Sequence, residues 1–499
     1  MNLIAQNLQI AWEKTIGGSL ADTPSKIIKT IDGGYLVCGT SNSNMSGNKS
    51  QNCYGFVDYW IVKLDMNGNI LWEKTIGGSA SDNLTSAIET SSGDIILAGS
   101  SNSDISYDKT ENSRGALDFW VVKINSLGTI IWDKTYGGSG YERLMTIDKL
   151  NDNELIIGGY SNSDVSGDKN ENSRGNYDYW MLKIDGNGSI IWQKTIGGSN
   201  VDILRSLKYD LDGNILLAGE SNSTISGDRT ISQPLSGDIW LLKLSNSGSI
   251  IWQKSFLAEN ISNILVNSSN EYVLLVTRPW STLPLKTSQL SYTIFSIIFK
   301  IDNNGNMIWN YTNYGANPDN ITSDLIEVED GYVYTSNYQY SIPIKAVVSK
   351  ISLSGSLVWN HFFETDSNEQ IPSICKSNNG LVCVVNSAAN SFGDKTENSF
   401  GQNDYWVVGF QPEALNLNSN SKNDFIVYPN PVDRYVTIKN PTEINFNLLI
   451  YNSLGQIVFQ KEKISSLEYQ TDLDLPSGSY FLKIEDQKNN FKIFKINKL

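Results

Sequence analysis

The segment Trp72-Glu-Lys-Thr-Ile-Gly-Gly-Ser79 returns sixty residues later as Trp132-Asp-Lys-Thr-Tyr-Gly-Gly-Ser139, and again as Trp192-Gln-Lys-Thr-Ile-Gly-Gly-Ser199. The series starts at Trp12 and extends to Trp252, Trp309 and Trp359, the last two steps being 57 and 50 residues. A second set lies twelve residues before most of these: Trp60, Trp120, Trp180 and Trp240, then Ile297 and Val347, with Trp406 last. This periodicity indicates seven repeats of one structural unit.

Each repeat contains four short runs of apolar and β-branched residues separated by turn residues. In the second repeat we expect strands at 85–90, 95–99, 118–124 and 129–136. Pairs such as Asn67-Gly68 and Asn187-Gly188 are typical of tight hairpins between antiparallel strands. Four strands in each of seven repeats predict an all-β fold, a seven-bladed β-propeller at residues 8–412.

The two ends of the repeated region complement each other. The last repeat ends with its third strand, 404–410, and no Trp-x-Lys strand follows it. The region begins instead with an extra fourth strand at 8–16. Because an unpaired edge leaves backbone groups without partners, we expect these strands to pair and close blade seven.

The segment Lys63-Leu-Asp-Met-Asn-Gly-Asn-Ile-Leu-Trp72 combines an Asp, a Gly turn and a Trp, and it recurs around Asp185, Gly188 and Trp192. It resembles the tryptophan-docking motif of quinoprotein-type propellers over residues 8 to about 411. The resemblance implies indoles packed between neighbouring blades. A quinone-cofactor dehydrogenase is one alternative, but that family has two adjacent cysteines, which this chain lacks.

A second domain is expected at 425–499, after a polar linker at 413–424. It contains Tyr428-Pro-Asn-Pro-Val432, a Leu-Gly-Gln turn at 454–456, Leu475-Pro-Ser-Gly-Ser-Tyr480 and a lysine-rich final strand. Short alternating strands between frequent turns predict an immunoglobulin-like β-sandwich.

These ordered motifs are similar to the type A C-terminal sorting domain of the bacterial type IX secretion system. The resemblance implies contact with that machinery and a protein that is secreted or displayed at the outer cell surface. The residues matching the motifs are Pro429, Asn430, Pro431, Gly455, Gly478, Tyr480, Lys495 and Lys498. Residues 1–7 look like the end of a signal peptide, and no stretch approaches the roughly 18 apolar residues of a transmembrane helix.

Charge and cysteine content narrow the possible partners. The 499 residues carry 38 Lys and Arg against 53 Asp and Glu, a net charge of −15. Such a chain repels phosphates and anionic lipid, so no nucleic acid partner is expected.

Cys375 and Cys383 flank a turn across which they could pair. Together with Cys38 and Cys53 they are too few to form a disulfide scaffold, and we expect free thiols.

Candidate catalytic and metal-binding residues are few. The single histidine, His361, excludes a histidine metal cluster, and we interpret it as structural. Carboxylates recur at matching positions of a glycine-rich loop and the strand after it, where oxygen ligands would suit Ca²⁺. They are Asp108, Glu111 and Asp118; Asp168, Glu171 and Asp178; and Asp394, Glu397 and Asp404. Lys169 and Arg174 oppose a cation there, so turn capping and local ion pairs are favoured, and no cofactor is expected.

A binding site is expected where the repeats diverge. Blades five and six replace the long polar loop of the other blades with 278–284 and 337–343, and they lose the Gly-Gly pair. Arg278, Trp280, Tyr338 and Tyr340 lie there, and such rings either stack on a ligand or fill space between blades. We predict a non-enzymatic binding or adhesion propeller that engages a glycan or a protein. The alternatives are a secreted carboxylate-dependent hydrolase of glycan or peptide, and a structural surface component.

Overall fold

The structure is a computed structural model that describes residues 8–232, 238–258, 260–279, 294–314, 324–338, 343, 345–378, 380–412, 425–428, 432–440, 445–452, 457–486 and 491–498. These residues form strands and turns, without a helix among them. The chain divides into two compact units, Met1–Pro412 and Glu413–Leu499.

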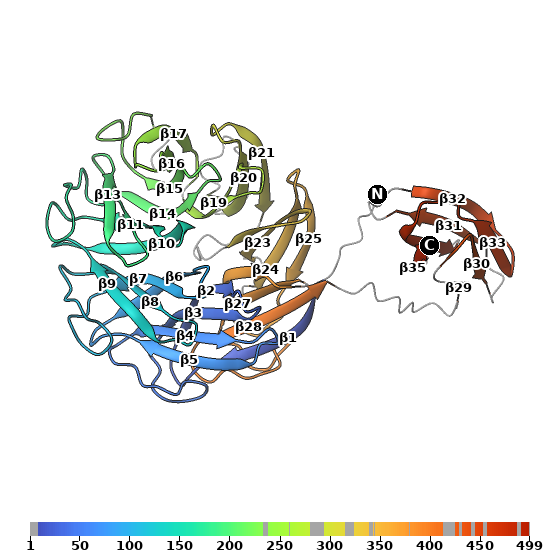
Figure 1. Cartoon of the computed structure of the whole chain (residues 1–499), viewed down its shortest axis with the longest axis horizontal. Coiled ribbons are helices and arrows are strands. Elements are labelled where there is room, and N and C mark those ends of the chain that lie inside the picture. Colours follow the sequence, from blue (N-terminus) through green and yellow to red (C-terminus); the bar gives the residue numbers. More distant parts are fainter. Residues whose placement is uncertain are drawn as a thin grey trace, which may run out of the picture. The chain divides into compact units, whose positions relative to one another are not determined.

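The described part of the first unit forms seven four-stranded antiparallel sheets arranged in a ring (Figure 1), which confirms the predicted propeller. Blade one contains β2 (Asp22–Lys29), β3 (Tyr35–Ser41), β4 (Asp58–Leu64) and β5 (Ile70–Ile76); blade two β6 (Asp82–Glu89), β7 (Ile95–Ser101), β8 (Asp118–Ile124) and β9 (Ile130–Tyr136); blade three β10 (Glu142–Asn151), β11 (Glu154–Ser161), β12 (Asp178–Ile184) and β13 (Ile190–Ile196); and blade four β14 (Asp202–Tyr209), β15 (Ile215–Ser221), β16 (Asp238–Leu244) and β17 (Ile250–Phe256).

The remaining blades follow the same order from the centre of the ring outward. Blade five contains β18 (Asn260–Val266), β19 (Tyr272–Pro279), β20 (Ile294–Ile301) and β21 (Met307–Tyr314); blade six β22 (Leu325–Val328), β23 (Gly331–Tyr338), β24 (Lys345–Ser352) and β25 (Leu357–Phe362); and blade seven β26 (Gln370–Lys376), β27 (Leu381–Ser387), β28 (Asp404–Pro412) and β1 (Leu8–Ile16). β1 pairs with β28, from Leu8 opposite Pro412 to Ile16 opposite Tyr405. The expected closure by both chain ends is confirmed.

The start of β6 differs most from the strand boundaries expected for the second repeat. β6 begins at Asp82, three residues before the expected start at 85. The side chain of Asp82 is buried and accepts hydrogen bonds from the Gly78 N–H (2.6 Å) and the Ser103 hydroxyl (3.1 Å). Local donors to one carboxylate oxygen thus offset part of the cost of burying an acidic residue at the start of an inner strand.

The two tryptophan sets hold each blade together and join it to the next. Third-strand indoles are fully buried, and that of Trp120 donates to Asp133 on the neighbouring strand (3.0 Å). Fourth-strand indoles reach the following blade, as Trp132 does by donating to the Gly186 carbonyl (3.2 Å). The packing implied by the docking motif is thus present.

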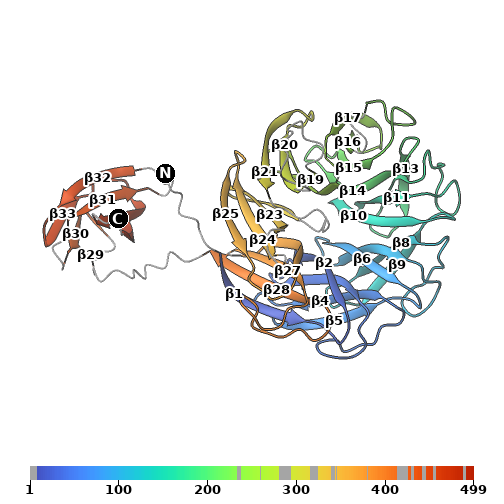
Figure 2. The ribbon, with the colours of Figure 1, turned by 180° about the vertical axis from the view of Figure 1, so that it is seen from behind.

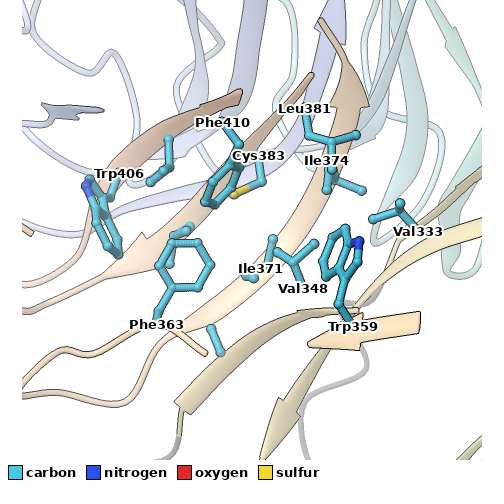
Figure 3. Packing of buried hydrophobic residues seen from close by; sticks show 13 residues of the cluster. Val333, Val348, Trp359, Phe363, Ile371, Ile374, Leu381, Cys383, Trp406 and Phe410 are labelled. Carbon is cyan, nitrogen blue, oxygen red and sulfur yellow. The ribbon is translucent and has the colours of Figure 1, made fainter. Parts of the chain in front are cut away.

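Between blades six and seven the fourth-strand indole, Trp359, packs within a cluster of apolar side chains (Figure 3). Trp359 of β25 lies against Val333 and Val348 of its own blade and faces Ile374 and Leu381 of blade seven. Close packing of large apolar groups compensates here for the divergence of the repeat.

The long loops between second and third strands pack against the Gly-Gly-Ser loops. The Ser79 N–H donates to the Ser106 hydroxyl (2.9 Å), and the Ser139 N–H donates to the Ser166 hydroxyl (2.8 Å). Both sets of loops therefore lie on the same face of the propeller, the one at which the inner strands begin. We call it the loop-rich face.

The second unit is a small β-sandwich. Its described strands form one sheet of β29 (Ile426–Tyr428), β30 (Tyr435–Lys439) and β33 (Glu468–Asp472), and another of β32 (Ile457–Ile464), β31 (Phe446–Tyr451), β34 (Gly478–Asp486) and β35 (Phe491–Lys498). Val436, Leu448 and Leu482 are among the buried residues between them. The predicted sandwich is confirmed.

Candidate ligand-binding channel

A channel of about 1100 Å³ runs through the centre of the propeller. Its walls are mainly the innermost strands, including β2, β6, β10, β14 and β18. Of these, β2, β6, β10 and β14 are labelled around the centre of the ring in Figure 2. Channels on rigid scaffolds are common ligand sites. Its residues therefore define the candidate site.

The middle of the channel carries a ring of polar side chains, which we call the polar belt. The members occupy equivalent positions at the inner edge of the seven blades. Each lies opposite the matching position of the second strand of its blade, as Lys26 lies opposite Cys38 and Ser86 lies opposite Ala98. In six blades this position directly follows a register shift in the inner strand. The belt consists of Lys26, Ser86, Thr146, Ser206, Asn263, Asp324 and Ser373.

Asp324 is the hub of the belt. It accepts hydrogen bonds from the amide of Asn263 (2.6 Å) and the hydroxyl of Ser373 (2.7 Å), and it pairs with the Lys26 ammonium group at 2.8 Å. Burial alone would raise the pKa of Asp324, but the charge of Lys26 and these hydrogen bonds outweigh it and lower that pKa. Asp324 is therefore held as a carboxylate.

The lining is more basic than the chain as a whole. It includes six cationic side chains, Lys26, Lys29, Arg143, Lys149, Arg205 and Lys208, against three carboxylates, Glu89, Asp148 and Asp324. Arg205 is neutralised by a two-pronged contact with Glu220 (2.8 and 3.0 Å). No described carboxylate lies within ion-pair distance of Arg143, which is exposed. Arg143 is thus an exposed cation that interacts with Tyr160 and is not paired with a described carboxylate.

Three tyrosines form a cluster where β10 begins at the loop-rich face, and one of them, Tyr160, lies opposite Arg143 in the sheet. The rings of Tyr141 and Tyr177 are 6.2 Å apart, and those of Tyr160 and Tyr177 are 5.4 Å apart, edge to face. Burial raises the pKa of Tyr160, and the charge of Arg143 opposes that rise. A cation beside half-buried rings suits a ligand that has both a flat face and a negative charge.

Arg143 was not among the residues predicted from the sequence. Its counterparts in blades one, two and four are Thr23, Asn83 and Ile203, so the repeat alignment alone shows the substitution. Its position inside the channel becomes visible only with the topology.

The predicted aromatic site lies almost entirely beyond the described part of the chain. Arg278 is in β19 and Tyr338 ends β23, but neither side chain is described. Trp280 and Tyr340 lie outside the described residues. This site stays a prediction.

The candidate calcium ligands have protein partners instead. Asp168 pairs with Arg114 (2.7 Å) and Glu171 pairs with Lys194 (3.3 Å), while the carboxylate of Asp178 accepts the Arg174 N–H (2.5 Å). In the other two loops the glutamates pair with lysines and the aspartates accept backbone N–H groups; these residues are Glu111 and Glu397, and Asp108, Asp118, Asp394 and Asp404. Within the described ranges, no three His, Cys, Asp or Glu side chains are grouped to hold a metal ion. Calcium binding stays a prediction.

The histidine and the four cysteines are not among the residues that line the channel. Burial lowers the pKa of His361, whose ring packs edge-on against Phe363 and Phe410 at 5.2 Å. All four cysteines are free. Burial raises the pKa of Cys53 to about 11, which makes it a poor nucleophile at neutral pH.

The sorting-motif residues that the structure describes stabilise the second unit. Tyr480 is buried in its core, and its hydroxyl donates to the Pro476 carbonyl (2.8 Å). Gly478 pairs with Lys498, and Lys495 lies in β35 opposite Phe481. Pro429, Asn430, Pro431 and Gly455 lie outside the described residues.

Residues 426–497 match the family described as Secretion system C-terminal sorting domain. The second unit is therefore a sorting domain of the type IX secretion system, and it directs the protein to the cell surface or the extracellular space. The described chain contains no helix of the length and apolar character needed to span a membrane.

Several solved structures are similar to this chain at low identity. Sqt1 from Chaetomium thermophilum shares 12% identity, with 81% of this chain and 100% of that chain covered and a TM-score of 0.39. A mutant of the Synechocystis apocarotenoid oxygenase shares 9% (80% and 92% covered, TM-score 0.38), and a puromycin hydrolase mutant complexed with PGG shares 9% (84% and 59% covered, TM-score 0.43). No curated protein matches the sequence.

Proposed function

We propose that the protein is an exported binding propeller that holds an acidic glycan at the loop-rich mouth of its channel. Export rests on the sorting domain at 426–497. The observation that carries the choice of ligand is Arg143, an exposed cation on the channel wall without a carboxylate partner among the described residues.

Electrostatics supports an anionic ligand in this place. The chain has a net charge of −15, whereas cationic side chains outnumber carboxylates in the channel lining. A negatively charged group is repelled by the rest of the chain and attracted by the channel. A guanidinium also binds a carboxylate through two parallel hydrogen bonds, which orients the ligand.

The surrounding groups favour a sugar. Tyr141, Tyr160 and Tyr177 offer ring faces and edges beside Arg143, and the polar belt below offers hydroxyl and amide groups. Pyranose rings use stacking together with hydrogen bonding, and a uronic acid adds the carboxylate that Arg143 would bind.

The hydrolase alternative has no comparable support. Of the lining carboxylates, Asp324 pairs with Lys26, Glu89 accepts the Ile31 N–H (2.8 Å) and Asp148 accepts the Tyr209 N–H (2.8 Å). A glycosidase needs two carboxylates facing the bond to be broken. We therefore favour binding.

The test is a printed oligosaccharide array with the full-length chain, using uronic acid-containing and neutral glycans. We expect binding to uronic acid-containing glycans that Arg143→Ala weakens at least tenfold, while the control Arg434→Ala in the second unit leaves it unchanged. Trp280→Ala tests in parallel whether blades five and six contribute. A wild type that binds no acidic glycan contradicts the function, and equal binding by Arg143→Ala contradicts the site.

A further inference from the structure

The long loops join neighbouring blades through a repeated contact. Arg114 of blade two reaches Asp168 of blade three (2.7 Å), and Arg174 of blade three reaches Asp228 of blade four (2.8 Å). Both aspartates also accept a backbone N–H from a Gly-Gly loop. These ion pairs close the loop-rich face between blades.

The boundary of blades one and two departs from this pattern. Tyr54 takes the position of the arginine, and its ring stacks on Tyr107 with centroids 4.6 Å apart and planes inclined by 14°. Asp108, the counterpart of Asp168, consequently has no arginine partner among the described residues.

A second departure lies beside the first. Glu111 pairs with Lys134 (2.8 Å) and accepts the Thr135 N–H, but in blade one Gln51 accepts the corresponding Thr75 N–H. Lys74 therefore lacks the carboxylate that pairs with its counterpart Lys134. Its charge still acts on Asp108, whose pKa is raised by burial and lowered in part by Lys74.

Tyr107 adopts a backbone conformation that its side chain disfavours. Its φ is 50°, and the matching residues of four other loops are Gly47, Gly167, Gly227 and Gly393, with φ of 56 to 61°. Non-glycine residues in this left-handed region are strained. Tyr107 is also 69% exposed, so burial does not compensate for the strain.

We propose that Tyr107 and Tyr54, with Asp108 and Lys74, form a second carbohydrate site, specific for neutral hexoses, at the boundary of blades one and two. A pyranose ring stacks on the open face of Tyr107, Asp108 accepts hydrogen bonds from its hydroxyl groups, and the Lys74 ammonium group donates to them. Because the charges of Asp108 and Lys74 offset each other, this site does not attract a negatively charged sugar and takes a different class of glycan from the channel.

A purely structural role for the tyrosine pair makes the opposite predictions. If stacking only replaces the Arg–Asp contact, restoring glycine at position 107 removes an inter-blade contact, lowers Tm and leaves glycan binding unchanged. If the pair is a binding site, Tyr107→Gly relieves backbone strain, keeps or raises Tm, and abolishes binding of neutral hexoses.

The experiment uses the full-length chain on a printed array of neutral hexose oligosaccharides, with Tm measured for each variant. We expect Tyr107→Gly to weaken neutral binding at least tenfold, while Tyr107→Phe and the same-loop control Ile105→Ala stay within twofold. Asp108→Asn keeps the side-chain size, so we expect it to weaken neutral binding without lowering Tm.

Two results overturn the inference: a wild type that binds no neutral hexose, or neutral binding by Tyr107→Gly equal to that of the wild type. The inference and the proposed function fail separately. Tyr107→Gly is expected to retain acidic-glycan binding, and Arg143→Ala is expected to retain neutral binding.

Discussion

Lys26 of blade one and Asp324 of blade six form an ion pair of 2.8 Å, although blade seven lies between these blades in the ring. Asp324 also binds Ser373 of blade seven and Asn263 of blade five. One carboxylate thus links four blades, at a place where the inner strand β22 has only four residues. The belt compensates for the shortest inner strand of the ring.

Asp324→Ala is therefore expected to destabilise the propeller by about 3 kcal/mol, because it leaves Lys26 and two polar side chains without their partner. Thermal or urea unfolding measures the loss. The control is Asp330→Ala in the same blade, which removes the ion pair between Asp330 and Lys350. Because the Asp330 side chain is 71% exposed, this variant should lose no more than about 1 kcal/mol of stability. Equal effects of the two variants would show that the belt contributes nothing beyond a surface pair.

Trp192→Ala tests the docking of one blade on the next. Its indole donates to the Asn246 carbonyl of blade four (3.2 Å) and packs against the core between the blades. We expect a loss of about 3 kcal/mol in the free energy of unfolding, measured by urea denaturation. Ile191→Ala, at an adjacent side chain that is 50% exposed, should change it by about 0.5 kcal/mol or less. A similar value for both would contradict inter-blade docking as a source of stability.

The buried aspartates predict that stability falls as pH rises. Burial, the main cause, raises the pKa of Asp58 and of Asp178 to about 6, from 3.8. The folded state therefore binds more protons than the unfolded chain between pH 4 and 6, so this contribution is complete at low pH and is lost as pH rises through 6. Tm at pH 5 is expected to exceed Tm at pH 7 by a few degrees.

The double variant Asp58→Asn, Asp178→Asn isolates these two groups, because an amide does not titrate in this range. Its Tm should change less between pH 5 and pH 7 than that of the wild type. An unchanged pH dependence would assign the effect to other groups, such as Glu369, whose pKa burial raises to about 7.

The repeated parts of the molecule were predictable because their contacts repeat. Trp132 and Trp192 meet equivalent carbonyls in the next blade, so one motif explains each interface. The belt was not predictable, because Lys26 and Asp324 are 298 residues apart and meet only after the ring has closed. Tyr107 was visible as a break in a glycine position, but its conformation and its partner Tyr54 required the structure.

Calcium is expected to leave the stability of the protein unchanged. The carboxylates that recur in the loops pair with lysine, arginine or backbone N–H groups, as Glu111 does with Lys134 (2.8 Å). A ligand that binds only the folded state raises Tm, and one that finds no site does not. We expect Tm in calcium chloride and in a chelator to agree within about 1 °C. A rise of several degrees with calcium would show that these loops bind the ion.

Tyr480→Ala is expected to prevent export. The side chain is 6% exposed in the core of the sorting domain, and its removal should cost about 3 kcal/mol or more, a large share of the stability of so small a domain. Tyr480→Phe loses only the hydrogen bond to the Pro476 carbonyl, about 1 kcal/mol, and should be exported almost normally. The exposed Tyr435 (43%) provides the control variant Tyr435→Ala. Immunoblots of periplasm and culture medium from a bacterium with an active type IX system measure the outcome. Efficient export of Tyr480→Ala would mean that the machinery does not need a folded sandwich core, only the strands or turns that carry the motif.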